Sequence, residues 1–129
     1  MKVIVTISES ALPIARTIQR EWLEAEVVRM SDKTFLTEHW KELECVVFVG
    51  AMGICVRTIA PLLDDKYTDP AVVCVDSTGK YVIPVVSGHI GGANDYSKRI
   101  AAILGGEAII TTQSDNLGLW AIDTFAQKY

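Results

Sequence analysis

The sequence predicts one α/β domain spanning residues 1–129, with helices on both faces of a mostly parallel sheet in a three-layer α/β/α arrangement. Short apolar runs alternate with segments whose apolar residues recur at helical spacing, which is the pattern of such a fold. Runs such as Cys45–Val49 are hydrophobic throughout, as expected of strands covered on both faces. The composition, 50% hydrophobic and 22% charged, is that of a folded globular protein, and the length suits one core.

The first part of the chain has the pattern of strand, helix, strand and helix. Residues 2–7 are mainly apolar, and the polar residues 8–10 that follow resemble a helix cap. Apolar residues then recur at helical spacing, and Pro13 is tolerated in a first helical turn. We therefore expect strands over residues 2–7 and 26–30, helices over residues 13–24 and 33–43, and a third strand at Cys45–Val49.

The second part continues the alternation with one hairpin. We expect a helix from Gly53 to Leu63 that Pro61 kinks or shortens, followed by a polar connection over 64–70. Two strands follow, at Ala71–Val75 and Tyr81–Val86, and then a helix that begins at Ala93 and is stopped by Gly105 and Gly106. The last elements are a strand over 107–112, a polar loop over 113–116 and a short helix over 117–128.

The turn over residues 76–80 has hairpin chemistry and would make the sheet mixed. If the helix after Gly53 is a right-handed crossover, the hairpin reverses the chain, and the loops after Val49 and Val86 emerge at opposite edges of the sheet. The later loop would then share its edge with residues 64–70, and with residues 111–115 if the last strand is parallel to its predecessor. The sequence pattern agrees with either arrangement.

Composition excludes several classes of protein. A net charge of −4 argues against a nucleic-acid surface, which needs a basic stripe. No segment has the apolar length of a membrane span, and the first residues run into a strand pattern rather than a signal peptide. We expect a cytoplasmic protein without nucleic-acid or membrane partners. Cys45, Cys55 and Cys74 share no CxxC spacing and lie in apolar runs, which indicates buried, reduced thiols.

Two glycine loops carry the candidate chemistry. The first glycine loop, Gly50-Ala51-Met52-Gly53, ends a strand and opens a helix, so a ligand can approach helix N–H groups that favour anions. Arg57 can lean back toward that helix end, where it would meet a carboxylate or phosphate. The alternative is an exposed arginine beside a packing turn. The GxGxxG and Walker patterns are absent, so the residues do not indicate nucleotide binding.

The second glycine loop is Ser87-Gly88-His89-Ile90-Gly91-Gly92-Ala93-Asn94. His89 could activate a water or hold an anion when protonated; the alternative is a histidine that only satisfies loop backbone groups. Ser87 and Asn94 suit helix capping as well as substrate contact, and the nucleophile pattern GxSxG is missing. Among the loop carboxylates Asp115 is the best acid candidate, because the strand ends of such sheets bind ligands.

Taken together, these motifs resemble the N-terminal domain of the CbiG family, which serves the anaerobic, early-cobalt route to cobalamin. The likeness runs from about Val46 to Asp115 in order and spacing. It is carried by Val49-Gly50-Ala51-Met52-Gly53-Ile54 with Arg57, Ala60 and Pro61, by Thr68-Asp69-Pro70-Ala71-Val72-Val73, by Ile83-Pro84, by the second glycine loop and by Ile110-Thr111-Thr112.

The resemblance implies cobalt-precorrin-5A hydrolase activity. In that reaction a δ-lactone is opened and a two-carbon fragment leaves as acetaldehyde, giving cobalt-precorrin-5B. The implied substrate is an anionic corrinoid intermediate that carries the cobalt itself, and no organic cofactor is implied. Family members usually continue into a linking region and a separate C-terminal domain, so that domain and other cobalamin-pathway enzymes are the implied partners.

We therefore hypothesise a hydrolase, or its N-terminal domain, in which His89 or Asp115 is the catalytic base. No protein metal ligand is expected. One alternative is a non-catalytic module that binds a corrinoid intermediate and passes it between enzymes; another is a generic anion- or nucleotide-binding domain. The expected substrate contacts are Gly50, Ala51, Met52, Gly53, Arg57, Ser87, Gly88, Gly91, Gly92 and Asn94.

Overall fold

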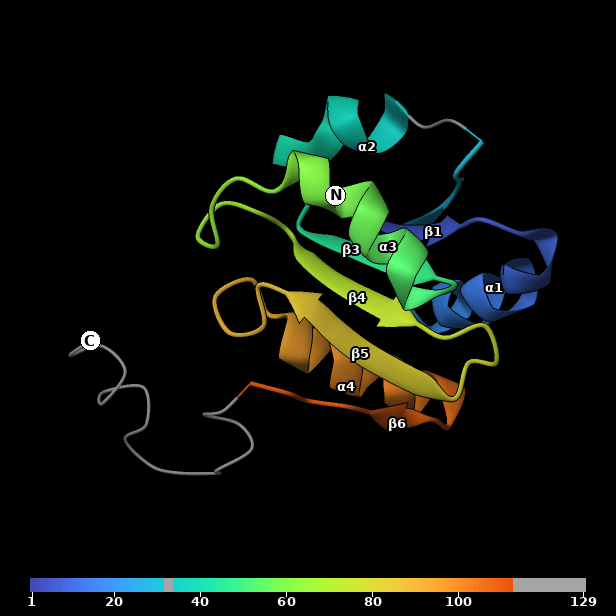
Figure 1. The fold of residues 1–129 in the computed structure, drawn as a ribbon. Coiled ribbons are helices and arrows are strands. Elements are labelled where there is room, and N and C mark those ends of the chain that lie inside the picture. Colours follow the sequence, from blue (N-terminus) through green and yellow to red (C-terminus); the bar gives the residue numbers. More distant parts are fainter. Residues whose placement is uncertain (32–33, 113–129) are drawn as a thin grey trace, which may run out of the picture.

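The computed structural model describes residues 1–31 and 34–112, which form a six-stranded sheet between two layers of helices (Figure 1). The predicted three-layer α/β/α class is confirmed. The strands are β1 (Lys2–Thr6), β2 (Ala25–Arg29), β3 (Cys45–Val49), β4 (Ala71–Val75), β5 (Tyr81–Val86) and β6 (Glu107–Ala108). The helices are α1 (Leu12–Glu21), α2 (Thr34–His39), α3 (Met52–Ile59) and α4 (Ala93–Leu104), with 3-10 turns η1 (Glu9–Ala11), η2 (Trp40–Glu42) and η3 (Ala60–Leu62).

The sheet is mixed, in the strand order β2-β1-β3-β4-β5-β6. β1 to β4 are mutually parallel, β5 is antiparallel to β4, and β6 is parallel to β5. The reversal occurs at a tight hairpin, whose turn is held by the Asp76 carboxylate. That carboxylate accepts hydrogen bonds from the backbone N–H groups of Thr78, Lys80 and Tyr81 at 3.1, 2.9 and 2.7 Å. The hairpin prediction is therefore confirmed.

Two hydrophobic cores lie on the two faces of the sheet. On one face α1 and α4 pack against β1, β3, β4 and β5, with Ile18, Trp22 and Ile100 fully buried. On the other face α2 and α3 cover β1, β3 and β4, with Leu36 and Ile59 among the buried side chains. β3 lies between the two cores and is buried along its whole length, which explains its unbroken run of apolar residues.

The helix that follows the first glycine loop is shorter than its apolar pattern. α3 ends at Ile59, and the next turn, which contains Pro61, is a 3-10 turn. A proline inside a helix has no N–H to donate and clashes with the preceding turn, so the predicted shortening by Pro61 is confirmed. α4 ends at Gly105, whose φ of 68° is a left-handed conformation that glycine adopts without strain.

The last strand is a correction to the sequence prediction. A strand was expected over residues 107–112, but β6 pairs with β5 only at Glu107 and Ala108. The Ile109 N–H still donates to the Val82 carbonyl at 2.8 Å. In a parallel ladder the next bond would come from the N–H of residue 84, and Pro84 has none, so the regular pairing stops.

The predicted loop over 113–116, the predicted helix over 117–128 and Asp115 lie outside the described residues. No helix within the described ranges combines the length and the apolar character that a membrane span requires. Cys45, Cys55 and Cys74 are buried and free, as predicted.

Candidate functional site

The two glycine loops lie at opposite edges of the sheet. The first follows β3 at the carboxyl edge, where β1, β3 and β4 end. The second follows β5, which runs the other way, and so lies at the amino edge, where β1, β3 and β4 begin. Five strand residues at about 3.3 Å each separate the two edges by roughly 16 Å. The arrangement with opposite edges, which the sequence left open, is the one observed.

The second glycine loop is closed on itself. Its Ser87 and Gly88 carbonyls accept the N–H groups of Ala93 and Asn94, each at 3.1 Å. These two amides open α4, so they are not available to an anion. The N-cap of α4 is Gly92 at φ 85°, which has no side chain with which to cap the helix. The backbone of the loop itself therefore closes it against the start of α4.

Close packing explains two glycines of this loop. A Cβ atom on Gly91 would lie 2.6 Å from Ser87 Cβ and 3.0 Å from the Ser87 carbonyl oxygen. A Cβ atom on Gly88 would lie 2.9 Å from Asn94 Oδ1 and 3.1 Å from Thr112 Cγ2. Ser87 itself has a φ of 60°, an uncommon value for a residue with a side chain. The chain passes through this loop too tightly for larger residues.

The amino edge brings together segments that are distant in the sequence. Asn94 is only 3% exposed, and its Nδ2 donates to Thr112 Oγ1 at 2.9 Å. Ser87 Oγ donates to the Asp69 carbonyl at 3.5 Å. The connection over 64–70 and the segment that follows β6, at Thr112, therefore meet the second glycine loop, as expected for this arrangement of the hairpin.

His89 and Ile90 form the exposed tip of the second glycine loop, and Ile90 is 54% exposed. An imidazole in this position is accessible to water and to a ligand from solution. The exposed imidazole can therefore reach a ligand at this edge.

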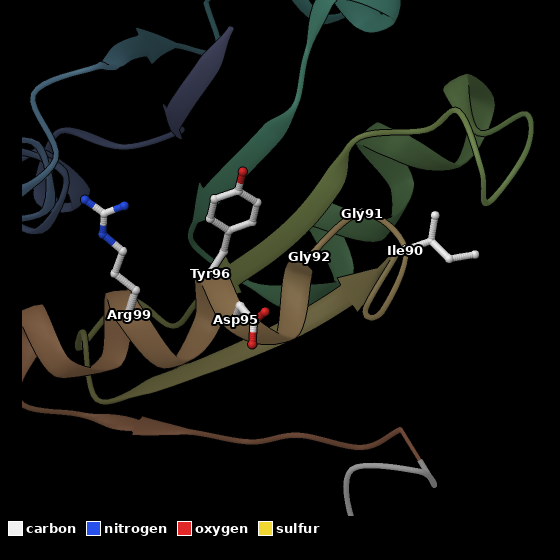
Figure 2. Close-up of a pocket in the computed structure, with 6 residues that line it drawn as sticks. All are labelled: Ile90, Gly91, Gly92, Asp95, Tyr96 and Arg99. Atoms are coloured by element: carbon white, nitrogen blue, oxygen red, sulfur yellow. The ribbon is translucent and has the colours of Figure 1, made fainter. Parts of the chain in front are cut away.

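A pocket of about 340 Å³ opens beside this tip, between the loop and the outer surface of α4. Figure 2 shows Tyr96 and Arg99 rising from α4 on the same side, with Ile90 at the end of the loop. Asp95 also lines the pocket, so its wall carries charges of both signs. The complete lining is Ile90, Gly91, Gly92, Asp95, Tyr96 and Arg99.

Trp22, at the end of α1, contacts two side chains that line this pocket. Its ring lies 5.4 Å from the Tyr96 ring, and the Arg99 guanidinium lies 5.1 Å from the Trp22 ring centre. Burial raises the pKa of the Tyr96 phenol above its ordinary value. Arg99 forms no ion pair within the described part of the chain, so its charge can serve a ligand.

The neighbouring Lys2 is already paired with two carboxylates of the protein. Lys2 Nζ lies 3.2 Å from Glu44 Oε2 and 3.6 Å from Glu24 Oε1, and the hydrogen bond to Glu44 raises the pKa of Lys2. Glu24 also accepts the Trp22 indole N–H at 2.7 Å, which is the main reason that the pKa of Glu24 is lowered. These carboxylates neutralise Lys2 and leave Arg99 as the cation at the pocket.

A second pocket, of about 310 Å³, lies on the other side of the same edge and is lined by Trp40, Lys41, Leu62, Asp64, Thr68 and Asp69. Asp69 organises it. Its carboxylate accepts the Trp40 indole N–H at 3.0 Å and the Asp64 N–H at 2.9 and 3.2 Å. The carboxylate thus holds the chain between Asp64 and Asp69, and the Asp69 carbonyl connects the pocket to the second glycine loop.

The first glycine loop is built differently. Gly50 adopts φ 155°, and its N–H donates to the Val75 carbonyl at 2.9 Å. The N-cap residue Ala51 has no side-chain cap, and the amides of residues 52–54 have no acceptor within the described ranges. Arg57 is exposed one turn further along α3 and forms no ion pair there. The open amides and the cation agree with the anion hypothesis, but they lie at the other edge from His89.

Within the described part of the chain, no three side chains of His, Cys, Asp or Glu come close enough together to hold a metal ion. Tyr96 and Arg99 are the candidate functional residues that sequence reasoning missed. Their helical spacing directly after the second glycine loop is the signal in the sequence that points to them.

Comparison with known proteins assigns the domain. The sequence profile of the family described as "Cobalamin synthesis G N-terminal" matches residues 34–115, which is more than half of the chain. The chain belongs to the CbiG N-terminal family. The matched region contains both glycine loops, Arg57, His89 and Asp115. The predicted resemblance is therefore confirmed.

Curated relatives of this CbiG N-terminal domain carry one name. The cobalt-precorrin-5A hydrolase of Salmonella typhimurium is 48% identical over 81 residues, which cover 63% of this chain and 23% of that protein. The cobalt-precorrin-5A hydrolase of Priestia megaterium is 33% identical over 144 residues, which cover 98% of this chain and 38% of that protein.

The fold of the domain also matches a solved structure. The crystal structure of a cobalamin biosynthesis protein G homolog from Sulfolobus solfataricus superposes with a TM-score of 0.77 at 33% identity, covering 84% of this chain and 36% of that one. The CbiG N-terminal domain described here thus spans 23–38% of the length of these three proteins.

Proposed function

We propose that the chain functions in cobalamin biosynthesis as the N-terminal part of a cobalt-precorrin-5A hydrolase and that the amino edge is its catalytic edge. Membership of the CbiG N-terminal family supports the reaction. The observation that supports the site is the exposed His89 next to Ile90, which lines a pocket together with Tyr96 and with Arg99, a cation that forms no ion pair within the described residues. We also place the protein in the cytoplasm, which agrees with its three free, buried cysteines.

The substrate is an anionic corrinoid intermediate with several carboxylate side arms. Arg99 offers a planar guanidinium that can pair with a carboxylate through two parallel hydrogen bonds. The Tyr96 ring and Ile90 offer apolar surface for the ring system or its methyl groups. A pocket of about 340 Å³ holds a side arm rather than a whole macrocycle. The rest of the substrate then lies over the open edge, where a C-terminal domain or another pathway enzyme can cover it.

His89 acts in this proposal as the general base for lactone opening. It takes a proton from a water, and the water oxygen bonds to the lactone acyl carbon while the bond from that carbon to the ring oxygen breaks. The released oxygen becomes the carbonyl of acetaldehyde when its carbon separates from the macrocycle, which keeps the electron pair. Asp115, which lies outside the described residues, is the second candidate base.

The first glycine loop has a separate place in the proposal. Gly50, Ala51, Met52, Gly53 and Arg57 offer open amides and a positive charge at the carboxyl edge. About 16 Å separates them from the amino edge, so they can hold a substrate carboxylate only if the ligand extends along the sheet or binds there in another step. Their role as substrate contacts remains a prediction.

The deciding experiment is acetaldehyde release from cobalt-precorrin-5A by the purified chain, by His89→Ala and by the matched control His39→Ala. His39 is the other histidine of the chain and lies on α2, where it is hydrogen-bonded to Glu42 at 3.0 Å. Release by the parent and the control, with loss in a folded His89→Ala protein, supports the general base. Release by all three rejects His89 and directs attention to Asp115.

Arg99→Gln separates binding from chemistry. If Arg99 holds a side-arm carboxylate, this variant should raise KM about tenfold or more while kcat changes little, since one charge-assisted contact is worth roughly 1.5–3 kcal/mol. A folded parent that binds the corrinoid but releases no acetaldehyde, with or without the relatives' C-terminal region, would instead support the non-catalytic binding module.

A further inference from the structure

Two of the six strands, β5 and β6, have a face that no described helix covers. α4 packs behind β5 and β6 on the side of α1, whereas α2 and α3 lie over β1, β3 and β4 on the opposite side. Figure 1 looks onto β5 from that opposite side, and no helix stands in front of it. Within the described ranges the helical layer on this side therefore does not extend over β5 and β6.

The uncovered surface is apolar. We call Tyr81, Ile83, Val85 and Ile109 the bare face. The first three alternate along β5 on the side away from α4, and the Ile109 N–H bonds to the Val82 carbonyl and so places Ile109 beside them. Tyr81 is 36% and Ile109 37% exposed, and Ile83 and Val85 are half-buried, with Val85 packed against the margin of the second core. A strand with one solvated face normally alternates apolar and polar residues, whereas β5 is apolar on both faces, as in a strand covered on both sides.

The chain supplies a suitable covering segment. Residues 113–129 lie outside the described residues and follow directly from Thr112, which is anchored at the end of β5 through Asn94. Within this segment Leu117, Trp120, Ala121 and Phe125 recur at the spacing of one helical face. A 12-residue helix is about 18 Å long, and the six residues of β5 extend about 20 Å. The segment matches the bare face in position, length and apolar character.

We propose that residues 117–128 dock on the bare face with Leu117, Trp120, Ala121 and Phe125 toward the sheet. The docked segment completes the third layer of the domain over β5 and β6. This inference rests on the sheet and the sequence pattern, and it is independent of the proposed hydrolase activity.

Native-state hydrogen exchange of the complete chain tests the proposal. Amides of residues 117–128 should exchange at least about tenfold more slowly than unstructured peptide, independent of protein concentration. Ile83→Asp places a charge in the centre of the bare face and should abolish this protection while β1 and α1 stay protected. Leu23→Asp is the matched control, because Leu23 is 86% exposed between α1 and β2, and it should leave the protection unchanged.

Three outcomes overturn the proposal. Exchange of residues 117–128 at the unstructured rate means that the segment does not dock. Protection that survives Ile83→Asp means that it docks elsewhere, and protection that grows with concentration means that a second copy is involved. If Ile83→Asp unfolds the whole domain, Ile109→Asp at the more exposed margin of the bare face decides by the same criteria.

Discussion

Substitution of one glycine in each loop should have opposite effects on stability. A Cβ atom at Gly53 would meet nothing within 4 Å, and the residue lies in the first turn of α3 without positive φ. Because alanine is better than glycine in a helix by about 0.5–1 kcal/mol, and because this position is near the helix end, Gly53→Ala should stabilise the domain by roughly 0.5 kcal/mol. For a domain of this size that gain raises Tm by about 2 °C.

Gly91→Ala should do the reverse. The added Cβ would lie 2.6 Å from Ser87 Cβ and 3.3 Å from the Ala71 backbone nitrogen, so the loop must shift. Overpacking of this kind costs about 1–3 kcal/mol, which lowers Tm by roughly 4–12 °C. Urea denaturation measures both changes as shifts of the midpoint at constant m-value. A destabilised Gly53→Ala protein, or a Gly91→Ala protein as stable as the parent, would refute the packing argument.

The Gly53→Ala variant also distinguishes an effect on stability from an effect on ligand binding at the first glycine loop. The domain does not need a glycine at position 53, so its open space is available to a ligand. If a substrate carboxylate approaches the amides there, Gly53→Ala should weaken corrinoid binding even though the protein becomes more stable. Unchanged affinity in the stabilised variant would remove Gly53 from the list of substrate contacts.

Three further predictions concern single interactions. Trp40→Phe removes the indole N–H that donates to the Asp69 carboxylate at 3.0 Å. Because hydrogen bonds to charged groups are worth roughly 1.5–3 kcal/mol, the free energy of unfolding measured in urea should fall by about 2–3 kcal/mol. A decrease below about 0.5 kcal/mol would contradict this prediction. The pKa of Glu24 is below its usual value of 4.5, mainly because its carboxylate accepts the Trp22 hydrogen bond. The ionised carboxylate therefore stabilises the folded protein above pH 4.5, and this stabilisation is lost as the pH falls. Glu24→Gln should make the decline of Tm in acid shallower, and a steeper decline would argue against this linkage. Burial raises the pKa of Cys45 to about 12, so a thiol reagent at pH 8 should modify it on the order of 100-fold more slowly in native than in urea-unfolded protein, and equal rates would show an accessible thiol.

Local signals predicted most of the fold. The bounds of β3, β4 and β5 agree with the sequence prediction because polar or glycine residues follow each apolar run, namely Gly50, Asp76 and Ser87-Gly88, and their effects act within a few residues. β6 was predicted too long because its extent depends on a partner strand. The missing N–H of Pro84 ends the ladder, and nothing near residue 109 signals this.

The candidate site shows the same division. His89 and the glycines around it could be recognised from the sequence, because a glycine-rich turn between strand and helix is a local pattern. The role of Arg99 could not be recognised in this way, because its guanidinium is placed by contact with the Trp22 ring, and Trp22 is distant from Arg99 in the sequence. The two loops lie at opposite edges because β5 runs antiparallel to β4. The sequence pattern was compatible with either arrangement, and the structure shows this one.

The β4–β5 hairpin also has a consequence for the order in which the domain folds. It is the only antiparallel pair of the described sheet, and a five-residue turn joins its strands, whereas each parallel pair must close a loop that contains at least a helix. Short closures form within microseconds and long ones are slower, so we expect the hairpin to be formed in the transition state. Asp76→Ala should then slow folding more than it speeds unfolding, and the reverse result would place the nucleus elsewhere. A chain nucleated at this hairpin assembles outward in two directions, adding β3, β1 and β2 on one side and β6 on the other, rather than from its first residue to its last.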